Sequence, residues 1–401
     1  MALPLEGYRV LDLSVWQQGS YASAMLADMG ADVIKIESYS NPDPGRTTLA
    51  AGSSERNAYF HSLNRGKRSI LLDLKAEAGQ EVFWRLVQTA DVFHNNMRGG
   101  VLERLGITFE RLQAANPGCI MSSATGWGHL GPDRTTGSMD TLAQARGGFM
   151  SVTGEGADGP PTMAGFPQAD HVGAIVSGYG IVLALLHRER GGEAQEVNTS
   201  LFGSQIAIQT FNITGALWAN EMRPRMTHQE RRPTWNHFQG GDGKWFMIGA
   251  LPADKWWVTF CEVMGAPDLA LPPYVTAEDR QARNAEVIAR MDAIFMTRTR
   301  DEWVDAFQAR DLLVQPVLDW IEVGGDPQAW ANGYMVEVPD EHGRLWPMVG
   351  SPVHLSKTPA QIARQAPAFG QHTEEVLLEL GYSWEELTSL RQRGAFGDSS
   401  Q

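Results

Sequence analysis

A single aspartate, Asp170, stands at a position where a carboxylate can do chemistry. It lies between a segment that contains Gly165 and Pro167 and a long apolar stretch that ends at Gly191 and Gly192. Apolar residues recur along that stretch at Val172, Ile175, Tyr179, Val182, Leu183 and Leu186. Their spacings of three and four predict a buried helix, and Asp170 would occupy its N-terminus.

Two interpretations of Asp170 are open at this point. An aspartate at a helix N-terminus commonly accepts a hydrogen bond from a free backbone N–H and is favoured by the helix dipole, which makes it a structural cap. The same surroundings keep a carboxylate ionised at neutral pH, and covalent catalysis by a carboxylate requires that form. The spacing of Asp170 alone does not choose between a cap and a nucleophile.

A second polar group, Gln17 and Gln18 followed by Gly19, lies in the first turn of the chain. Residues 8–14 are typical of a strand, residues 22–29 of a helix and residues 30–37 of a second strand. This order predicts a βαβ unit with parallel strands. Ligands of such sheets bind outside the carboxyl ends of the strands, so we expect one near these glutamines. The turn lacks the pattern G-x-G-x-x-G, so a nicotinamide dinucleotide is not indicated.

Basic and amide side chains flank the next predicted strands. Lys67 and Arg68 precede a strand within residues 64–75, and either phosphate contacts or solvated charges explain them. Asn95 and Asn96 end a further strand. Strands and helices alternate over the first ~120 residues, which predicts a doubly wound α/β domain with a mainly parallel, Rossmann-like sheet.

The rest of the chain predicts other elements. Residues 39–55 are polar and rich in turn formers, which indicates a loop. A block from about 225 to 325 mixes strands and helices and is typical of a smaller α+β domain. A strand pair is expected around His342 and Gly343, and a helical hairpin follows Gly370.

The composition of the 401 residues excludes several classes of function. The net charge of −14 argues against nucleic acid and anionic membranes as partners. The two cysteines, Cys119 and Cys261, form neither a disulfide framework nor a metal cluster, and no metal site is predicted. The N-terminus does not resemble a signal peptide, and we expect no membrane span and a cytoplasmic location.

Several longer motifs identify a family. They are LEGYRVLDLS, LADMGADVIKIE, NRGKRSILLDLK, ADVFHNNMRGG with ERLGI, QARGG, the FPQAD helix start, LALLHRERGGEAQEVNTSL and GQHTEEVLLELGY. In this order along the chain they resemble the family III CoA-transferases, the group of formyl-CoA transferase and carnitine CoA-transferase. The resemblance implies an enzyme that moves CoA from an acyl-CoA thioester to a carboxylic acid. It also implies coenzyme A as a substrate with no permanently bound cofactor, and an interlocked homodimer.

The resemblance assigns roles to individual residues. Asp170 matches the catalytic aspartate, which forms an acyl-aspartyl anhydride and then an aspartyl-CoA thioester. Gln17 matches a glutamine that contacts the acyl group, with Gln18 beside it. Asp140 falls where formyl-CoA transferase carries a glutamate, and Tyr59 matches an aromatic residue of the acyl pocket. The positions that match CoA contacts are Leu72, Lys75, Asn96 and Arg104.

The sequence also departs from the family pattern. Ser38 and Gly137 replace expected basic residues. Either Lys67, Arg68 or Arg98 compensates for them, or the CoA phosphates are held differently. No tetraglycine segment is present, which disfavours formate and oxalate as substrates. The sequence therefore does not decide which two carboxylic acids exchange CoA. By the same resemblance the large CoA-binding domain combines residues 1–200 and 330–401, the small domain is 225–325, and residues 201–224 and 326–329 are linkers.

Two other functions compete with CoA transfer. An α-methylacyl-CoA racemase shares the fold and needs an acid and a base at the α-carbon, typically a histidine and an aspartate. The segment TGSMDTLAQ has no histidine, and the nearest ones, His129 and His171, are better explained as structural. A protein that binds CoA thioesters without chemistry is the second alternative, because a fold does not guarantee an activity.

Overall fold

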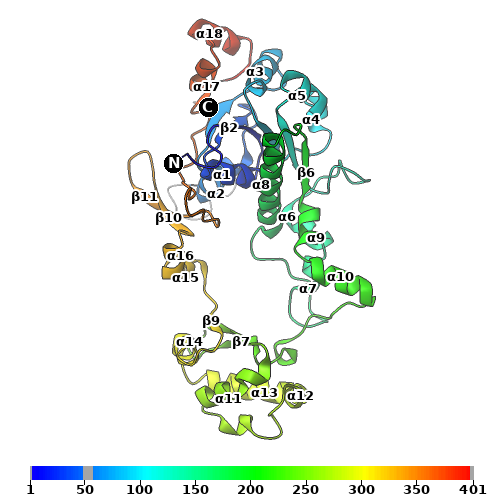
Figure 1. Ribbon diagram of the computed structural model, residues 1–401, viewed down its shortest axis with the longest axis vertical. Coiled ribbons are helices and arrows are strands. Elements are labelled where there is room, and N and C mark those ends of the chain that lie inside the picture. Colours follow the sequence, from blue (N-terminus) through cyan, green and yellow to red (C-terminus); the bar gives the residue numbers. More distant parts are fainter. Residues whose placement is uncertain (1, 48–56, 398–401) are drawn as a thin grey trace. The chain divides into compact units, whose positions relative to one another are not determined.

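The computed structural model describes residues 2–47 and 57–397 of the chain, which form two compact units (Figure 1). The first unit contains residues 1–150, 163–218 and 328–401, and the second contains residues 151–162 and 219–327. The predicted loop at 39–55 contains the short 3-10 helix η1 (Pro44–Arg46), and its residues 48–55 lie outside the described part.

The first unit is built on a six-stranded sheet in which all neighbouring strands are parallel. Its order is β3-β2-β1-β4-β5-β6, which is that of a doubly wound dinucleotide-type sheet. The strands are β1 (Arg9–Leu13), β2 (Asp32–Glu37), β3 (Arg68–Leu71), β4 (Val92–Asn95), β5 (Ile120–Thr125) and β6 (Glu196–Ser200). The predicted α/β class with a mainly parallel sheet is confirmed.

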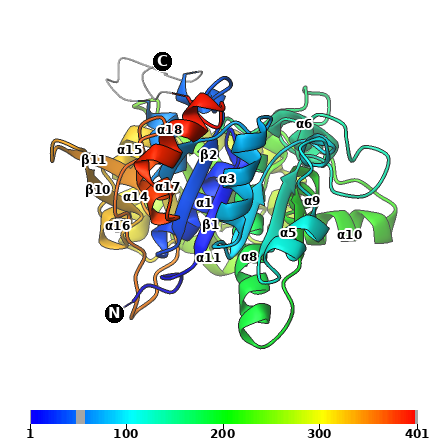
Figure 2. The same ribbon diagram turned by 90° about the horizontal axis from the view of Figure 1, so that it is seen from above.

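Helices cover both faces of this sheet because side chains alternate along each strand (Figure 2). On β1, Val10 packs in a core with the helix residues Leu26 and Ile181, whereas Leu11 packs in a second core with Phe83 and Leu377. The helices of this unit are α1 (Gln18–Asp28), α2 (Ala58–Asn64), α3 (Glu77–Val87), α4 (Val101–Arg104), α5 (Phe109–Ala115), α6 (Asp140–Arg146), α8 (Gln168–Glu189), α9 (Leu201–Ala207), α10 (Thr210–Ala219), α17 (Thr373–Glu379) and α18 (Trp384–Gln392).

The prediction of which face of α8 is buried is wrong. The side chains that pack inward are small or lie between the predicted positions: Ala169, Gly173, Ala174, Ser177, Gly178, Ile181, Ala184 and Leu185. Most of the predicted stripe is exposed by 42% to 65% in the single chain: Ile175, Tyr179, Val182, Leu183 and Leu186. The physical reason is close approach. A Cβ on Gly173 would lie 2.9 Å from Gln18 Nε2, and one on Gly180 would lie 2.6 Å from Val197 Cγ1.

Helix α8 bears on the expectation of no membrane span, for which length and apolarity are the two measures. It is the one helix in the described part that passes by these two measures, with a mean hydropathy of 1.6. The helix lies against α1, β5 and β6, and core helices of this kind pass the same test.

The C-terminal part of the chain protects the open edge of β3. The backbone N–H of His372 donates to the carbonyl of Ser69 at 2.8 Å, and the N–H of Leu71 donates to Thr373 Oγ1 at 3.0 Å. Strands β10 (Met335–Pro339) and β11 (Leu345–Val349) precede this segment as an antiparallel pair. The predicted hairpin around His342 and the helical pair after Gly370 are both confirmed.

The second unit has its own antiparallel sheet, in the order β7-β8-β9, and its own hydrophobic core. The helical segment at residues 277–295 is interrupted at Arg283, where the backbone leaves the helical region. The elements are β7 (Trp235–Gln239), β8 (Trp245–Gly249), β9 (Val314–Pro316), η2 (His228–Glu230), η3 (Pro267–Ala270), α11 (Ala253–Met264), α12 (Ala277–Ala282), α13 (Asn284–Phe295), α14 (Arg300–Gln308) and α15 (Trp320–Gly324). Helices α7 (Phe149–Val152) and α16 (Pro327–Ala331) lie where the two units meet in the sequence. The predicted functional division into a CoA-binding domain and a small domain stays a prediction.

Candidate active site

A cavity of about 450 Å³ opens in the first unit at the carboxyl ends of β1, β4 and β5. It is the place where ligands of doubly wound sheets bind. Seven residues singled out in the sequence line it: Gln17, Gln18, Tyr59, Asn96, Arg98, Asp140 and Asp170. The structure therefore brings the predicted catalytic and acyl-pocket residues together, although they are spread over more than 150 positions of the chain.

Asp170 is the third residue of α8, and its backbone is held by a second carboxylate. The N–H of Asp170 donates to Asp140 Oδ2 at 3.0 Å. Asp140 Oδ1 accepts from Gln144 Nε2 at 2.5 Å, and Gln144 Oε1 accepts from the N–H of Ala164 at 2.9 Å. This chain of hydrogen bonds ties the start of α6 to the start of α8 and to the loop before it.

The helix position excludes the interpretation of Asp170 as an N-cap. The N-cap residue of α8 is Pro167, which makes no side-chain capping bond, and the free N–H of Asp170 is accepted by Asp140. The carboxylate of Asp170 lines the cavity instead. The nearest charged group that affects it is not a cation but Asp140.

The prediction that these surroundings keep Asp170 ionised is also corrected. Burial and, second, the negative charge of Asp140 raise the pKa of the Asp170 carboxyl to about 7. Desolvation disfavours the charged form, and two carboxylates at one site cannot easily ionise together. The same burial raises the pKa of the Tyr59 hydroxyl, with further contributions from the charges of Asp170 and Asp43. Asp170 is therefore poised to gain or lose a proton near neutral pH.

Gln17 and Gln18 occupy the start of α1, which begins four residues earlier than predicted. Gln17 is the N-cap residue and its side chain is not used for capping. Its amide lies 3.2 Å from Nδ1 of His171, the residue after Asp170. Gln18 Nε2 is buried and has no hydrogen-bond partner in the described part of the chain.

A buried ion pair holds the turn that carries these glutamines. Lys35 Nζ donates to Asp43 Oδ2 at 2.8 Å and to the carbonyl of Ser14 at 2.7 Å. Asp43 Oδ1 accepts from the N–H of Trp16 at 3.1 Å, and Trp16 has a φ of 61°. A residue with a bulky side chain rarely adopts this left-handed conformation, so the contacts around it must compensate for the strain.

A second buried pair corrects both interpretations of Lys67. Its side chain is completely buried and donates at 2.8 Å to Asp12 Oδ2 and to the carbonyl of Ser20, beneath the first turn of α1. Burial lowers the pKa of Lys67 to about 8, while the charge of Asp12 opposes this shift. Arg68 is paired with Asp32, Glu375 and Glu379. Neither side chain is a phosphate ligand or a freely solvated charge, because both are taken up by carboxylates of the fold.

Asn96 and Arg98 fix two loops at the cavity. Asn96 accepts from the N–H of Val15 at 2.9 Å and donates to its carbonyl at 2.6 Å, which holds the turn after β1. Arg98 Nε donates to the carbonyl of Thr135, and the loop comes so close that a Cβ on Gly99 would lie 2.4 Å from the carbonyl oxygen of Arg134. Only glycine fits at position 99.

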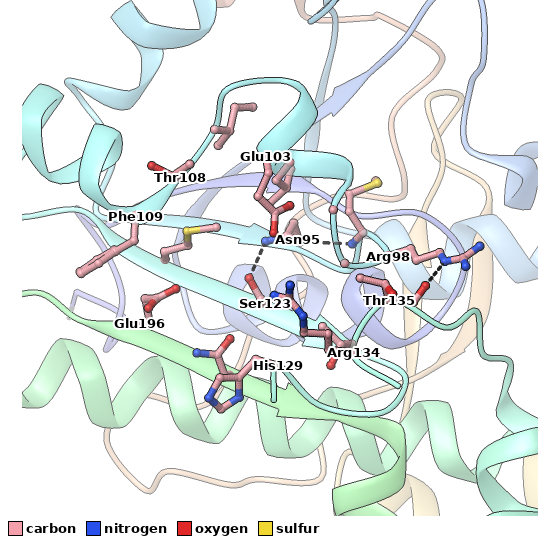
Figure 3. Close-up of a pocket in the computed structure, with 18 of the residues that line it drawn as sticks. Asn95, Arg98, Glu103, Thr108, Phe109, Ser123, His129, Arg134, Thr135 and Glu196 are labelled. Atoms are coloured by element: carbon pink, nitrogen blue, oxygen red, sulfur yellow. Dashed lines mark hydrogen bonds between the residues drawn. The ribbon is translucent and has the colours of Figure 1, made fainter. Parts of the chain in front are cut away.

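A second cavity of about 340 Å³ adjoins the first on the side of β4, β5 and β6 (Figure 3). Arg98 and Arg134 line both cavities, and both residues are exposed. His129 and Glu196 line only the second cavity. Figure 3 shows Asn95 joined to Ser123 in its floor, by a hydrogen bond of 3.0 Å from Asn95 Nδ2 to the serine hydroxyl.

Three predicted CoA contacts do not line these two cavities. Leu72 is buried in the core, next to β3. Lys75 and Arg104 are exposed, on the segment after β3 and at the end of α4. Their contact with CoA stays a prediction.

Two residues of the cavity region were not assigned a catalytic or pocket role from the sequence. His171 was considered only for racemase chemistry, although its place directly after Asp170 is a signal. Arg134 was missed because it stands in a glycine- and threonine-rich segment with no periodic pattern. Among residues 2–47 and 57–397, no group of three or more His, Cys, Asp or Glu side chains is placed to hold a metal ion.

Comparisons with known proteins agree with this geometry. Residues 5–373 match the family described as CoA-transferase family III. The chain is 35% identical to the succinate–glutarate CoA-transferase of Agrobacterium fabrum, over 94% of this chain and 96% of that protein. It is 32% identical to the formyl-CoA:oxalate CoA-transferase of Escherichia coli O157:H7, over 98% of this chain and 100% of that protein. Its fold is similar to a CAIB/BAIF family protein of Brucella suis, with a TM-score of 0.86 and 30% identity over 95% and 100%.

The raised pKa of Asp170 predicts a pH-dependent effect on stability. In the unfolded chain an aspartate titrates near pH 4, about 3 units below the folded value. The stability that the protonated group contributes is complete below about pH 4 and is lost as the pH rises through 7. Asp170→Asn removes this loss, so its Tm should exceed that of the wild type by several degrees at pH 8 and match it near pH 4.

Thermal unfolding followed by circular dichroism at both pH values measures this effect. Asp158→Asn, at an exposed position, is the control and should leave the Tm unchanged at both. A difference for Asp170→Asn that is the same at pH 4 and pH 8 contradicts the raised pKa.

Proposed function

The chain belongs to CoA-transferase family III and is a transferase that moves CoA between an acyl-CoA thioester and a carboxylic acid, and from this premise we propose that Asp170 is its covalent relay. The observation that carries the proposal is the buried Asp170 carboxyl beside Asp140, in a cavity at the carboxyl edge of the sheet. The proposal assigns the chemistry to a residue of this chain rather than to a bound cofactor.

The proposed reaction passes CoA through Asp170 in balanced steps. A carboxylate oxygen of Asp170 attacks the acyl carbon of the thioester, the carbon–sulfur bond breaks, and CoA leaves as a thiolate. The thiolate attacks the aspartyl carbonyl of the anhydride and releases the donor acid. The acceptor carboxylate then attacks the aspartyl thioester, and the thiolate returns to the acceptor's carbonyl and frees Asp170. Anhydride and thioester are similarly activated, so no ATP is needed.

The electrostatics of the site suit a nucleophilic carboxylate. A pKa of about 7 leaves a large fraction of Asp170 ionised at neutral pH. Because the carboxylate is poorly solvated, little water has to be removed before it attacks. Asp140 acts on Asp170 in two ways: it accepts the backbone N–H of Asp170, and its negative charge raises the pKa of the Asp170 carboxyl and so opposes its ionisation.

We assign the remaining roles by position. Gln17, Gln18 and Tyr59 surround the acyl group in the cavity. Leu72, Lys75, Asn96, Arg98 and Arg104 hold the CoA moiety, with the cationic side chains on its phosphates.

We further propose that the acceptor acid carries a second carboxylate. Arg134 and Arg98 line the same cavity as Asp170, and a guanidinium there favours a substrate with an anionic group in addition to the reacting one. The loop of Arg134 is fixed, because Arg98 and Gly99 hold its backbone. The relative from Agrobacterium fabrum is named for succinate and glutarate, which are acids of this class.

The competing functions have less support. A racemase needs a histidine that faces Asp170 across the α-carbon. His129 lines only the neighbouring cavity, and Nδ1 of His171 lies 3.0 Å from the carbonyl of Pro167. A protein that only binds CoA thioesters does not need a buried carboxyl group with a pKa of about 7 in its cavity. Exchange of the α-proton in heavy water would identify a racemase.

We also propose that the enzyme is a homodimer. The exposed stripe of α8, with Tyr179, Leu183 and Leu186, is a large apolar surface on a chain with a net charge of −14. Exposed contiguous apolar patches usually mark a protein interface. A second copy is the proposed occupant because family members are interlocked dimers. The interlocked arrangement itself stays an expectation from the family.

Loss of the Asp170 carboxyl group tests the proposed covalent relay. Asp170→Ala should reduce CoA transfer by at least about 10⁴-fold, because the nucleophile is lost. The affinity for free CoA, measured by calorimetry, should change by less than about threefold, since it rests on other residues. In the wild type, kcat/KM should fall below pH 7 as Asp170 becomes protonated.

Asp140→Asn is the companion variant. It removes a negative charge, so the acid limb of its pH profile should move to lower pH while part of the activity remains. Transfer by Asp170→Ala at a near wild-type rate would defeat the assignment, and an acid limb that stays in place in Asp140→Asn would exclude Asp140 as a cause of the raised pKa.

The second prediction concerns the acceptor. Arg134→Met should lower kcat/KM for succinate or glutarate by about 10- to 100-fold, the worth of a charge-assisted hydrogen bond. Butyrate, which lacks the second carboxylate, should be used at a rate within about twofold of the wild type.

Arg104→Met is the matched variant, because the residue is assigned to CoA. It should raise the KM for the thioester with every acceptor alike. If Arg134→Met behaves in this way too, Arg134 contacts CoA and the proposed acceptor class loses its support.

The third prediction concerns assembly. Leu183→Glu buries a charge in the proposed interface and should convert the dimer to monomer at micromolar concentration, measured by light scattering after gel filtration. Arg190→Glu, at an exposed position near the end of the same helix, should stay dimeric. A wild type that is monomeric at all concentrations would refute the proposal.

A further inference from the structure

The contact between His171 and Gln17 joins the residue after Asp170 to a residue that lines the cavity. Nδ1 of His171 lies 3.0 Å from the carbonyl oxygen of Pro167 and 3.2 Å from the amide nitrogen Nε2 of Gln17. A carbonyl oxygen can only accept a hydrogen bond. Without a proton on Nδ1, two lone pairs would face each other at this distance. Nδ1 must therefore carry the hydrogen in both the neutral and the charged imidazole.

A protonated Nδ1 decides how the Gln17 amide is turned. The nitrogen and oxygen of an amide occupy equivalent places, so their orientation follows from the groups they face. With Nε2 of Gln17 placed toward Nδ1–H, two donors oppose each other, and turning the amide by 180° about its last side-chain bond removes this conflict. The favourable orientation places the amide oxygen of Gln17 toward His171 and its NH₂ group toward the cavity.

The parts of this contact are held in place by their neighbours. The His171 ring lies between Tyr21, at 5.1 Å between ring centroids, and Phe166, at 6.3 Å. The backbone N–H of His171 also donates to the carbonyl of Pro167, at 3.2 Å. Gln17 is fixed as the N-cap residue of α1 and is largely buried. The imidazole therefore cannot turn away without losing its packing.

We propose that His171 is a positioning residue that orients the Gln17 amide so that its NH₂ group donates a hydrogen bond into the cavity beside Asp170. This inference rests on the proposed covalent relay through Asp170. The recipient is the carbonyl oxygen of the acyl group under attack, on which negative charge develops. In the opposite orientation the Gln17 oxygen would repel that charge.

The role follows from the chemistry of acyl transfer. When the Asp170 carboxylate attacks, the carbonyl double bond becomes an oxyanion before the carbon–sulfur bond breaks. A donor that is already oriented stabilises the oxyanion without reorganisation, and the loss of one such donor typically costs about 10²–10³ in kcat. His171 does not touch the reacting atoms. It acts through Gln17, so its loss should cost less, on the order of tenfold.

Kinetics of four variants test the inference. His171→Phe keeps a ring for the contacts with Tyr21 and Phe166 but removes Nδ1. It should lower kcat on the order of tenfold and leave the KM for the acyl-CoA within about twofold. In the Gln17→Ala background the same substitution should have no further effect on kcat, because no amide remains to be oriented. Gln17→Glu keeps the shape but presents oxygen to the cavity, so its kcat should be at least as low as that of Gln17→Ala.

Each contrary result overturns the inference. An equal fall in both backgrounds would mean that His171 acts on the fold alone. No fall in either background would mean that it has no part in the reaction. A wild-type kcat in Gln17→Glu would show that no donor is needed at this position.

A measurement on the wild-type protein covers the case in which His171→Phe does not fold. Imidazole ¹⁵N shifts of the labelled enzyme report the tautomer, and the His171 signals can be assigned with His171→Asn. Hydrogen on Nδ1 is expected, whereas hydrogen on Nε2 alone would overturn the inference. A failure of the relay itself is distinguishable, since Asp170→Ala would then remain active whatever His171 does.

Discussion

The site depends on one contact, in which a carboxylate both supports and repels its neighbour. Asp140 accepts the backbone N–H of Asp170 at 3.0 Å, so it fixes where α8 begins. Its negative charge adds to burial and raises the pKa of the Asp170 side chain to about 7. The hydrogen bond to the backbone and the shift of the pKa both come from the Asp140 carboxylate, so a displacement of Asp140 would change both. Gln144, fully buried, carries the support onward to the loop at Ala164.

The opposite wall of the cavity is held by charge buried in the fold. The Lys35–Asp43 and Lys67–Asp12 pairs lie under the turn after β1, and Asp43 also holds the N–H of Trp16 in its left-handed conformation. Such pairs cost desolvation and seldom add much net stability, but removing one partner leaves an unpaired buried charge. Their physical effect here is geometric. They fix the turn so that Gln17 and Gln18 face the start of α8 rather than solvent.

The sequence predicted the sheet and most residues of the site, and each wrong prediction has a specific physical cause. Alternation of strands and helices predicted the parallel sheet, and the motifs placed Asp170, Asp140, Gln17 and Tyr59 at one site. The buried face of α8 was predicted wrongly because the hydrophobic period marks apolar side chains, while close packing on α1 selects glycine and alanine. The partner of Lys67 was not predictable, because Asp12 is distant in the sequence and only the tertiary fold brings it near. The prediction that Asp170 stays ionised failed for the same reason. Burial and the charge of Asp140, which raise its pKa, both arise from the tertiary fold.

The central claim is that Asp170 carries CoA as a covalent thioester during turnover, and trapping that species tests it most directly. The enzyme would be mixed with its acyl-CoA donor, quenched with acid within one turnover, digested and analysed by tandem mass spectrometry. The account predicts a CoA adduct on the peptide that contains Asp170, removed by hydroxylamine and replaced by an alcohol after borohydride reduction. Continued turnover with no adduct on this peptide, or with the adduct on another residue, would contradict it.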